Sequence, residues 1–280
     1  ARLLLGHALE QGQEYLYLNS EEVVPEERLS SFRKLVERRR ERIPWQYLLG
    51  HSEFMSLDLL VNEEVMIPRP ETEILVEAAL NKLGIRYSVF GVRQKPTIVN
   101  RQPTTDNRLP VFIDLGTGSG NIAIALAKFS CRVYALDISA AALQVAGVNA
   151  RRCAVDRSIT FLQDDIFALG KLEGLEGKAD LLISNPPYVA TCQLDELQPE
   201  VSRFEPRLAL DGGKDGLNFY PPLIERATVF LHRGGYLALE VGIGQAEVVK
   251  GLIIEASQFC LPEVIKDYAG IERVIVARKR

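Results

Sequence analysis

The second half of the chain alternates segments of two kinds, and this alternation restricts the possible folds more than any other feature of the sequence. From Val111 onward, short apolar runs of strand length alternate with residues whose apolar positions recur at helical spacing. Strands that alternate with helices form a mostly parallel sheet that is covered on both faces. We therefore expect an α/β domain with strands at residues 111–115, 133–137, 159–162, 179–184, 236–241, 264–268 and 273–277, and with helices at 122–129 and 140–151.

The last two expected strands have only a short connection, through Ala269-Gly270. A parallel pair needs a long crossover, whereas an antiparallel pair can be joined by a tight turn. The two strands must therefore pair antiparallel where the sheet closes.

The first part of the chain has a different pattern and is expected to form a smaller unit. Residues 1–50 show helical periodicity, and a helix at about 25–42 has an apolar face opposite a run of arginines. Residues 51–70 have strand-like content with a turn at 62–64, which predicts a β-hairpin linker. Residues 71–280 then form the larger domain, whose first helix starts near Pro70. A polar stretch at 84–110 is expected to be a surface insertion.

Charge and cysteine content exclude several classes of function. The 280 residues have a net charge of −4, which argues against direct binding of duplex DNA. The four cysteines are widely spaced, which is typical of reduced thiols in a cytoplasmic protein. The three histidines lie far apart, so no metal site is expected. No apolar run approaches the roughly 20 residues that cross a bilayer, and we expect no membrane segment.

A glycine-rich loop follows the first expected strand. Residues 114–120 read Asp-Leu-Gly-Thr-Gly-Ser-Gly and open a helix. Glycines allow the backbone to approach a ligand closely, and open α/β sheets bind nucleotides at this place. The candidate cofactor-binding residues of the loop are Gly116, Thr117, Gly118, Ser119 and Gly120.

Acidic residues follow the next two strands. Asp137 ends the second strand about twenty residues after the loop, where an acid can accept the ribose hydroxyls of a nucleoside. An N-cap is the alternative role for Asp137, although Ser139 can take it. Asp165 follows the third strand, where an acid can face the amino group of adenine. The loop departs from the dinucleotide fingerprint, and these features fit either NAD or S-adenosylmethionine.

The tetrapeptide Asn185-Pro186-Pro187-Tyr188 directly follows the fourth expected strand. Two prolines keep the backbone extended and lack N–H donors, which leaves carbonyl groups free to face a ligand. The side-chain oxygen of Asn185 and the carbonyl of Pro186 can each accept one N–H of a planar NH2 group. Such positioning directs a weakly nucleophilic nitrogen at a sulfonium methyl group. Tyr188 can stack on a planar substrate or face the developing positive charge.

The tetrapeptide alone leaves the nitrogen unidentified. An amide nitrogen and the N6 nitrogen of adenine need the same clamp, so an adenine methyltransferase is an alternative. That enzyme would need a segment for recognising and extruding the base, and the sequence shows none. A regulatory module that binds a nucleotide without catalysis is a further alternative, but it has no use for Asn185 and its prolines.

The chain also resembles a known family over nearly its whole length. The matching segments are Arg38-Arg39-Arg40 with Pro44 and Gly50, residues 67–73, residues 114–120, residues 185–188, Phe204-Glu205-Pro206 with Ala209-Leu210, and Asp215-Gly216-Leu217. In combination these are similar to the bacterial peptide-chain release factor glutamine methyltransferases, the PrmC/HemK family.

The resemblance implies a fold, an activity and residue roles. The fold would be a small helical N-terminal domain joined through a β-hairpin to a class I, Rossmann-like methyltransferase domain. The activity would be methylation of the side-chain N5 of the glutamine in a Gly-Gly-Gln motif of class-1 release factors, with S-adenosylmethionine converted to S-adenosylhomocysteine. By position, 116–120, Asp137, Asp165 and Ile166 would bind the cofactor. Asn185 would touch both cofactor and substrate, and residues 186–188 would clasp the glutamine.

Overall fold

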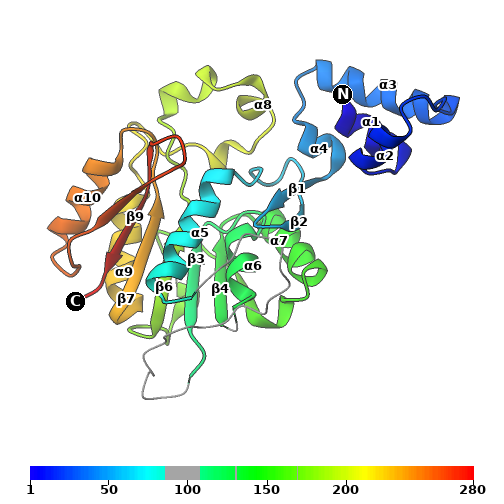
Figure 1. The fold of residues 1–280 in the computed structure, drawn as a ribbon. Helices are drawn as coiled ribbons and strands as arrows, with labels where there is room; N and C mark the ends of the chain where they lie inside the picture. Colours follow the sequence, from blue (N-terminus) through cyan, green and yellow to red (C-terminus); the bar gives the residue numbers. More distant parts are fainter. Residues whose placement is uncertain (86–107, 130, 169) are drawn as a thin grey trace.

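The larger part of the molecule is built around a seven-stranded sheet. The computed structural model describes residues 1–85, 108–129, 131–168 and 170–280, so most of the expected 84–110 insertion lies outside the described residues. The strand order is β5-β4-β3-β6-β7-β9-β8 (Figure 1). The strands are β3 (Val111–Leu115), β4 (Arg132–Asp137), β5 (Ile159–Gln163), β6 (Ala179–Ser184), β7 (Leu231–Glu240), β8 (Glu263–Lys266) and β9 (Glu272–Arg278).

The pairing of these strands confirms the mostly parallel sheet that the sequence predicts. β3 to β7 run parallel, whereas β9 pairs antiparallel with both β7 and β8. The main difference is that β7 begins at Leu231, well before the expected residue 236. Gly234 and Gly235 interrupt the apolar pattern of this strand, and the sequence therefore concealed its first half.

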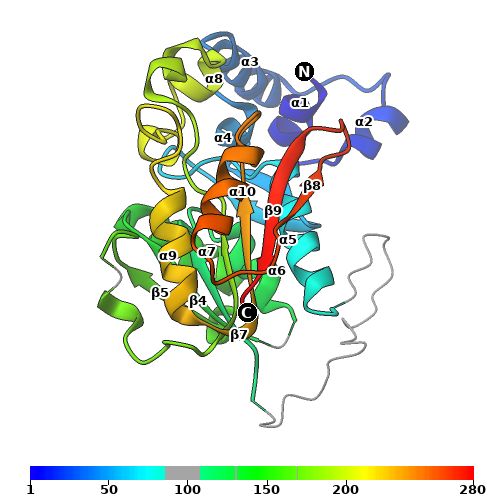
Figure 2. The same cartoon turned by 90° about the vertical axis from the view of Figure 1, so that its left-hand side faces the viewer.

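Helices cover both faces of the sheet. α5 (Pro70–Lys82), α6 (Asn121–Ala127) and α7 (Ala140–Arg152) pack on one face, and α9 (Tyr220–Phe230) and α10 (Ala246–Glu255) on the other (Figures 1 and 2). Neighbouring strand residues alternate between the two cores, because Phe112 contacts the first group of helices and Ile113 the second. Each of these fully buried side chains contributes about 2–3 kcal/mol of transfer free energy.

The N-terminal part consists of short helices with a core of their own. These helices are α1 (Arg2–Leu9), α2 (Gln13–Leu18), α3 (Glu26–Arg40) and α4 (Trp45–Leu49). Leu4, Ile43 and Leu48 form their buried cluster, which is separate from the two cores of the sheet. Arg39 and Arg42 of this part both bind Glu200 at 2.7 Å, on the short helix α8 (Pro199–Ser202) of the larger part.

A β-hairpin lies between the two parts. It consists of β1 (His51–Phe54) and β2 (Leu57–Leu60), and its turn is at Met55-Ser56, where φ is 48° and 60°. The expected turn at 62–64 exists but follows the hairpin. The sequence did not indicate the tight turn, because neither residue is one that favours positive φ. Glu73 of α5 stabilises the turn by accepting the N–H of Met55 at 2.6 Å.

Asn149 of α7 connects this hairpin to the glycine loop. The side chain is fully buried, accepts the N–H of Leu60 at 2.7 Å and donates to the Leu60 carbonyl at 2.9 Å. It also donates to the carbonyl of Ser119 at 3.0 Å. One amide therefore fixes the end of β2 against the loop that follows β3.

Candidate active site

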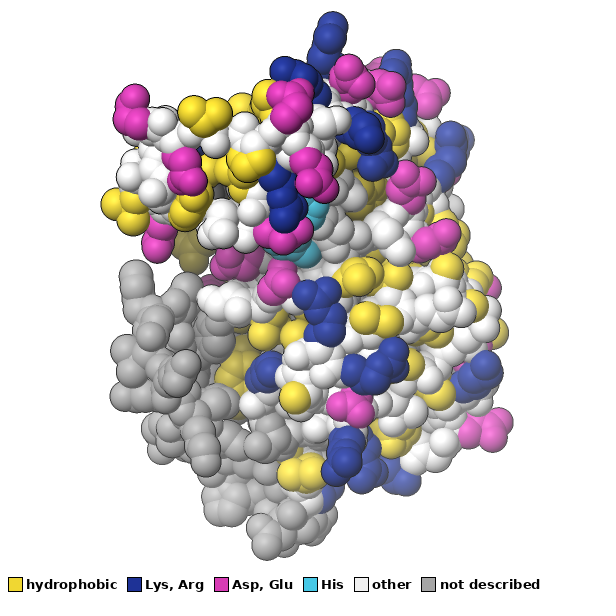
Figure 3. Space-filling view, turned by 90° about the vertical axis from the view of Figure 1, so that its right-hand side faces the viewer, with side chains coloured by type: hydrophobic (Ala, Val, Ile, Leu, Met, Phe, Trp, Pro, Cys, Tyr) yellow, Lys and Arg dark blue, Asp and Glu magenta, His cyan; other side chains and the backbone are white. Residues whose placement is uncertain are grey.

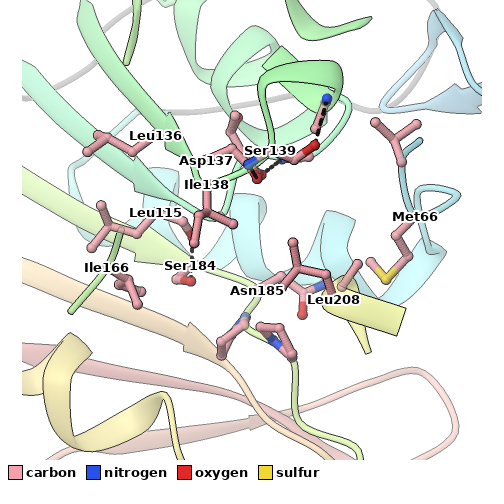
Figure 4. A pocket seen from close by; sticks show the side chains of 18 of the residues that line it. Met66, Leu115, Leu136, Asp137, Ile138, Ser139, Ile166, Ser184, Asn185 and Leu208 are labelled. Atoms are coloured by element: carbon pink, nitrogen blue, oxygen red, sulfur yellow. Dashed lines mark hydrogen bonds between the residues drawn. The ribbon is translucent and has the colours of Figure 1, made fainter. Parts of the chain in front are cut away.

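A cavity of about 400 Å³ lies at the carboxyl ends of β3, β4 and β6. This volume falls within the usual range for small-molecule sites. Its walls come from segments that are far apart in the sequence (Figure 4). The lining segments are 115–119 with 121–122, 136–139 with Ala142, 164–167, 184–187 and Phe219, and the rim is formed by 64–66, Pro68, Pro206 and 208–209.

The glycine loop presents bare backbone to the cavity. Gly116 and Gly118 have φ of 77° and 54°, and a Cβ atom on either would meet no protein atom within 4 Å. The space beside both residues is therefore open to a ligand. Gly120 differs, because its Cβ would lie 3.0 Å from Cβ of Ala146, and Gly120 is not among the lining residues. Its glycine allows α6 and α7 to pack closely.

Asp137 faces the cavity with its carboxylate fixed by backbone groups. One oxygen accepts the N–H of Gly118 at 2.8 Å and the other accepts the N–H of Ser139 at 2.9 Å. Ser139 caps α7 by accepting the N–H of Ala142, so Asp137 is not the N-cap. Burial raises the pKa of Asp137 from its ordinary value. Each oxygen keeps a lone pair that can accept a hydroxyl group.

Asp114 lies beneath the loop and is fully buried. Thr117 donates its hydroxyl to Oδ2 of Asp114 at 2.6 Å, whereas Oδ1 has no hydrogen-bond partner among the described residues. Burial raises the pKa of Asp114 to about 7. A buried carboxylate oxygen without a partner destabilises the folded protein.

One wall of the cavity is apolar. Ile138, Ile166 and Phe167 contribute to it, and Asp165 lies beside them. The ring of Phe167 packs against that of Phe219, with 5.5 Å between their centroids. Asp165 and Ile166 are predicted from the sequence as cofactor-binding residues, whereas the two phenylalanines are not. Phe219 precedes a helix that was not predicted, and no motif marks it.

Asn185 enters the cavity from the opposite side, followed by Pro186 and Pro187 (Figure 4). Its Nδ2 donates to Oγ1 of Thr72 at 2.9 Å, and Thr72 donates to Oε2 of Glu240 at 2.7 Å. This connection could not be predicted from the sequence, because Thr72 and Glu240 are 168 positions apart.

Tyr188 is turned away from the cavity and is not among its lining residues. The side chain packs in the core beside α9 and α10, and its hydroxyl lies 3.3 Å from Oε1 of Glu240. Burial and the neighbouring Glu240 raise the pKa of Tyr188 above its ordinary value. In this position the ring fixes the end of the tetrapeptide.

An ion pair joins the two sides of the rim. Arg69 follows Pro68 and binds Glu205, which precedes Pro206, with 2.5 Å between nitrogen and oxygen. The Glu205 side chain is only 1% exposed. Burial raises the pKa of Glu205, and Arg69 opposes that rise. The two prolines of the rim are therefore positioned by one largely buried pair.

The strand order and the placement of the cavity define a class I S-adenosylmethionine-dependent methyltransferase. The model of a methyltransferase domain matches residues 107–241. A solved methyltransferase from Pyrococcus furiosus is 20% identical and aligns with a TM-score of 0.55 over 86% of this chain and 98% of its own. The human methyltransferase 10 domain-containing protein aligns with a TM-score of 0.54 at 14% identity, over 80% and 89%.

Full-length relatives define the family more narrowly. The chain belongs to the release factor glutamine methyltransferase family. The model of the PrmC N-terminal domain matches residues 1–50. The release factor glutamine methyltransferase of Moorella thermoacetica is 41% identical over 100% of this chain and 90% of its own length. That of Geobacter sulfurreducens is 38% identical over 98% and 87%.

The cavity fits S-adenosylmethionine, the cofactor of this family. The open space beside Gly116 and Gly118 admits the amino-acid part, the Asp137 carboxylate suits ribose hydroxyls, and the apolar wall suits a planar base. Within the described ranges, no group of three or more His, Cys, Asp or Glu side chains could bind a metal ion. None of the helices in the described part of the chain is both long and apolar enough to span a membrane.

Proposed function

We propose that this chain methylates the side-chain N5 of the glutamine in the Gly-Gly-Gln motif of class-1 peptide-chain release factors, in the cytoplasm. The observation that carries the proposal is that Asn185, Pro186 and the glycine loop open onto one cavity. A clamp for a planar NH2 group thus lies beside a site that fits the methyl donor. The relatives matched over the whole chain are named for this activity, which supports a protein substrate.

Within this proposal, the cofactor lies against Gly116, Thr117, Gly118 and Ser119. Asp137 accepts the ribose hydroxyls, and Asp165 and Ile166 border the adenine ring. When bound, the cofactor supplies a methyl group on a positively charged sulfur. Gly120 acts indirectly, because its close contact with Ala146 sets the position of α6 behind the loop.

Two acceptors orient the substrate amide. The Oδ1 atom of Asn185 and the carbonyl oxygen of Pro186 each accept one N–H of the glutamine side chain. This orientation would point the nitrogen lone pair at the methyl group that the cofactor, held by the glycine loop and Asp137, would supply. The nitrogen afterwards loses one proton to water, so no strong base is required. Positioning and electrostatic stabilisation supply the rate enhancement.

The test is a transfer assay with labelled S-adenosylmethionine. Release factor, tRNA and DNA are offered in parallel, together with a release factor whose Gly-Gly-Gln glutamine is replaced by glutamate. Label is expected in the intact release factor alone. Label confined to nucleic acid would contradict the proposal.

A variant isolates the role of Asn185. In Asn185→Ala, labelling of the release factor should fall at least a hundredfold, because one of two acceptors in the transition state is lost. Cofactor binding measured by calorimetry should change much less. Unchanged turnover in this variant would exclude the assigned role.

An adenine-N6 methyltransferase remains the alternative function, since the clamp suits either nitrogen. The upper part of the face shown in Figure 3 does not favour it, because Lys and Arg lie there among Asp and Glu. Counterion release from nucleic acid needs clustered cations. The tRNA and DNA arms of the assay decide between the two functions.

A further inference from the structure

A buried chain of hydrogen bonds leads away from Asn185 behind the cavity. Nδ2 of Asn185 donates to Oγ1 of Thr72, and the Thr72 hydroxyl donates to Oε2 of Glu240. Thr72 and Glu240 are each 1% exposed. Neither residue is among those that line the cavity.

The Glu240 carboxylate determines which group donates and which accepts in each of these hydrogen bonds. An ionised carboxylate can only accept hydrogen bonds. Thr72 must therefore give its single hydroxyl hydrogen to Glu240, and its oxygen is left to accept from Asn185. The branch of the Asn185 amide that faces Thr72 must then be NH2, and the oxygen must occupy the other branch.

This donor-to-acceptor order matters because the two orientations of an asparagine amide have the same shape and opposite polarity. With the oxygen on the outer branch, Asn185 can accept an N–H of the substrate. With the amide reversed, an NH2 group would face the substrate NH2 group. One of the two acceptors for the reacting nitrogen would then be lost.

We propose that Thr72 and Glu240 are positioning residues that fix the amide of Asn185 with its oxygen toward the substrate nitrogen. This inference rests on the proposed function, since it gives Asn185 the role of acceptor. The same carboxylate also lies within 3.3 Å of the Tyr188 hydroxyl through its other oxygen. Glu240 thereby fixes both ends of the tetrapeptide that follows β6.

The surroundings of Glu240 make the donor-to-acceptor order of these hydrogen bonds dependent on pH. Burial raises its pKa to about 7, while Thr72, Tyr188 and Arg273 of β9 oppose the rise and Glu71 of α5 adds to it. From α9, the Tyr220 hydroxyl faces the backbone oxygen of the same residue at 3.3 Å.

Protonation of Glu240 removes the constraint on the orientation of the Asn185 amide. A protonated Glu240 can donate to Oγ1 of Thr72, and Thr72 can then give its own hydrogen to the oxygen of a reversed Asn185 amide. Below its folded pKa the carboxyl group no longer selects one orientation. The turnover number should therefore fall as the pH is lowered through about 7.

The test compares three substitutions in the full-length enzyme with release factor as substrate. Thr72→Val keeps the shape and removes the hydroxyl, and should lower kcat roughly ten- to a hundredfold, the effect of one charge-assisted hydrogen bond. KM for S-adenosylmethionine should stay within about twofold because no cofactor contact changes. Thr72→Ser should restore most of kcat. Thr228→Val, which removes a hydroxyl bonded to the Glu225 carbonyl on α9, should have no effect.

The pH profile of kcat, measured at saturating cofactor and substrate, separates positioning from a packing defect. The wild-type enzyme should lose activity below about pH 7, and this limb should be absent in both Thr72→Val and Glu240→Gln. A wild-type kcat without a limb near neutral pH would overturn the inference even if Thr72→Val fails to fold.

The outcomes also separate this inference from the proposed function. Wild-type labelling of release factor together with undiminished kcat in Thr72→Val would overturn the positioning role alone. Absence of release-factor labelling by the wild-type enzyme would instead refute the function on which the role rests.

Discussion

Replacing Arg69 by Met tests whether the rim of the cavity depends on its buried ion pair. The Glu205 side chain is 1% exposed and that of Arg69 is 29% exposed. Removing one partner of a buried pair leaves the other charge in a poorly solvated place, which costs about 3–5 kcal/mol. Because Arg69 is partly exposed and water can enter its place, we expect a loss of about 3 kcal/mol at pH 8.

The destabilisation caused by Arg69→Met should increase as the pH rises. Burial already raises the pKa of Glu205, and loss of Arg69 raises it further. A raised folded pKa means that the cost is absent below the ordinary pKa of a glutamate and grows as the pH rises toward the folded value. The destabilisation should therefore shrink to about 1 kcal/mol or less at pH 5.

Urea unfolding at pH 8 and pH 5 measures both quantities. The double variant Arg69→Met, Glu205→Gln should recover most of the loss, because no charge is then left buried. Arg33→Met provides the matched control, since its partner Glu26 is exposed, and its midpoint should be unchanged. A loss below about 1 kcal/mol in Arg69→Met at pH 8, or an equal loss at both pH values, would refute this reasoning.

Three further variants test the loop and its supports. Gly120→Ala should lower the free energy of unfolding by about 2–4 kcal/mol in urea, because φ is 81° and the new Cβ would lie 3.0 Å from that of Ala146; a loss under 1 kcal/mol would contradict the packing role. Asn149→Ala should cost about 2–4 kcal/mol by thermal unfolding, because Leu60 and Ser119 lose their buried partners; a change under 1 kcal/mol would show that water replaces the amide. In the wild-type protein the raised pKa of Asp114, about 7, means that stability is lost as the pH rises from about 4 to 7, so Asp114→Asn should flatten that dependence by roughly 2–4 kcal/mol, and an unchanged slope would exclude Asp114 as its source.

Much of the sheet could be predicted because its central strands, β3 and β6 among them, are buried on both faces. β3 and β6 have the predicted bounds, since each is a mostly apolar run that is followed at once by a motif residue, Gly116 after β3 and Asn185 after β6. α9 and α10 were missed, although both have buried faces against the sheet. Pro221 and Pro222 in the first turn of α9 break the apolar spacing that marks a helix, while being tolerated there structurally.

Several residues that line the cavity could also be predicted, whereas the buried residues that hold them in place could not. Gly116, Asp137 and Asn185 follow strands directly, and the carboxyl ends of parallel strands meet at one edge of the sheet. Thr72 and Glu240 carry no local signal, because their pairing depends on α5 packing against β7. Only the folded chain shows which glutamate, among many, accepts from that hydroxyl.

The position of Glu240 in the sequence has a consequence for biosynthesis. A chain emerging from the ribosome folds from its N-terminal side, so the glycine loop, Thr72 and Asn185 are all available before β7 has been made. The Glu240 carboxylate, which is linked to Thr72 and through it to Asn185, comes only at the end of β7, and β9 must still insert between β7 and β8 to complete the sheet. A nascent chain can therefore contain every residue of the cavity wall while the side-chain amide of Asn185 is not yet held in one orientation. Full catalytic rate is therefore expected only after β7 has formed and paired within the sheet.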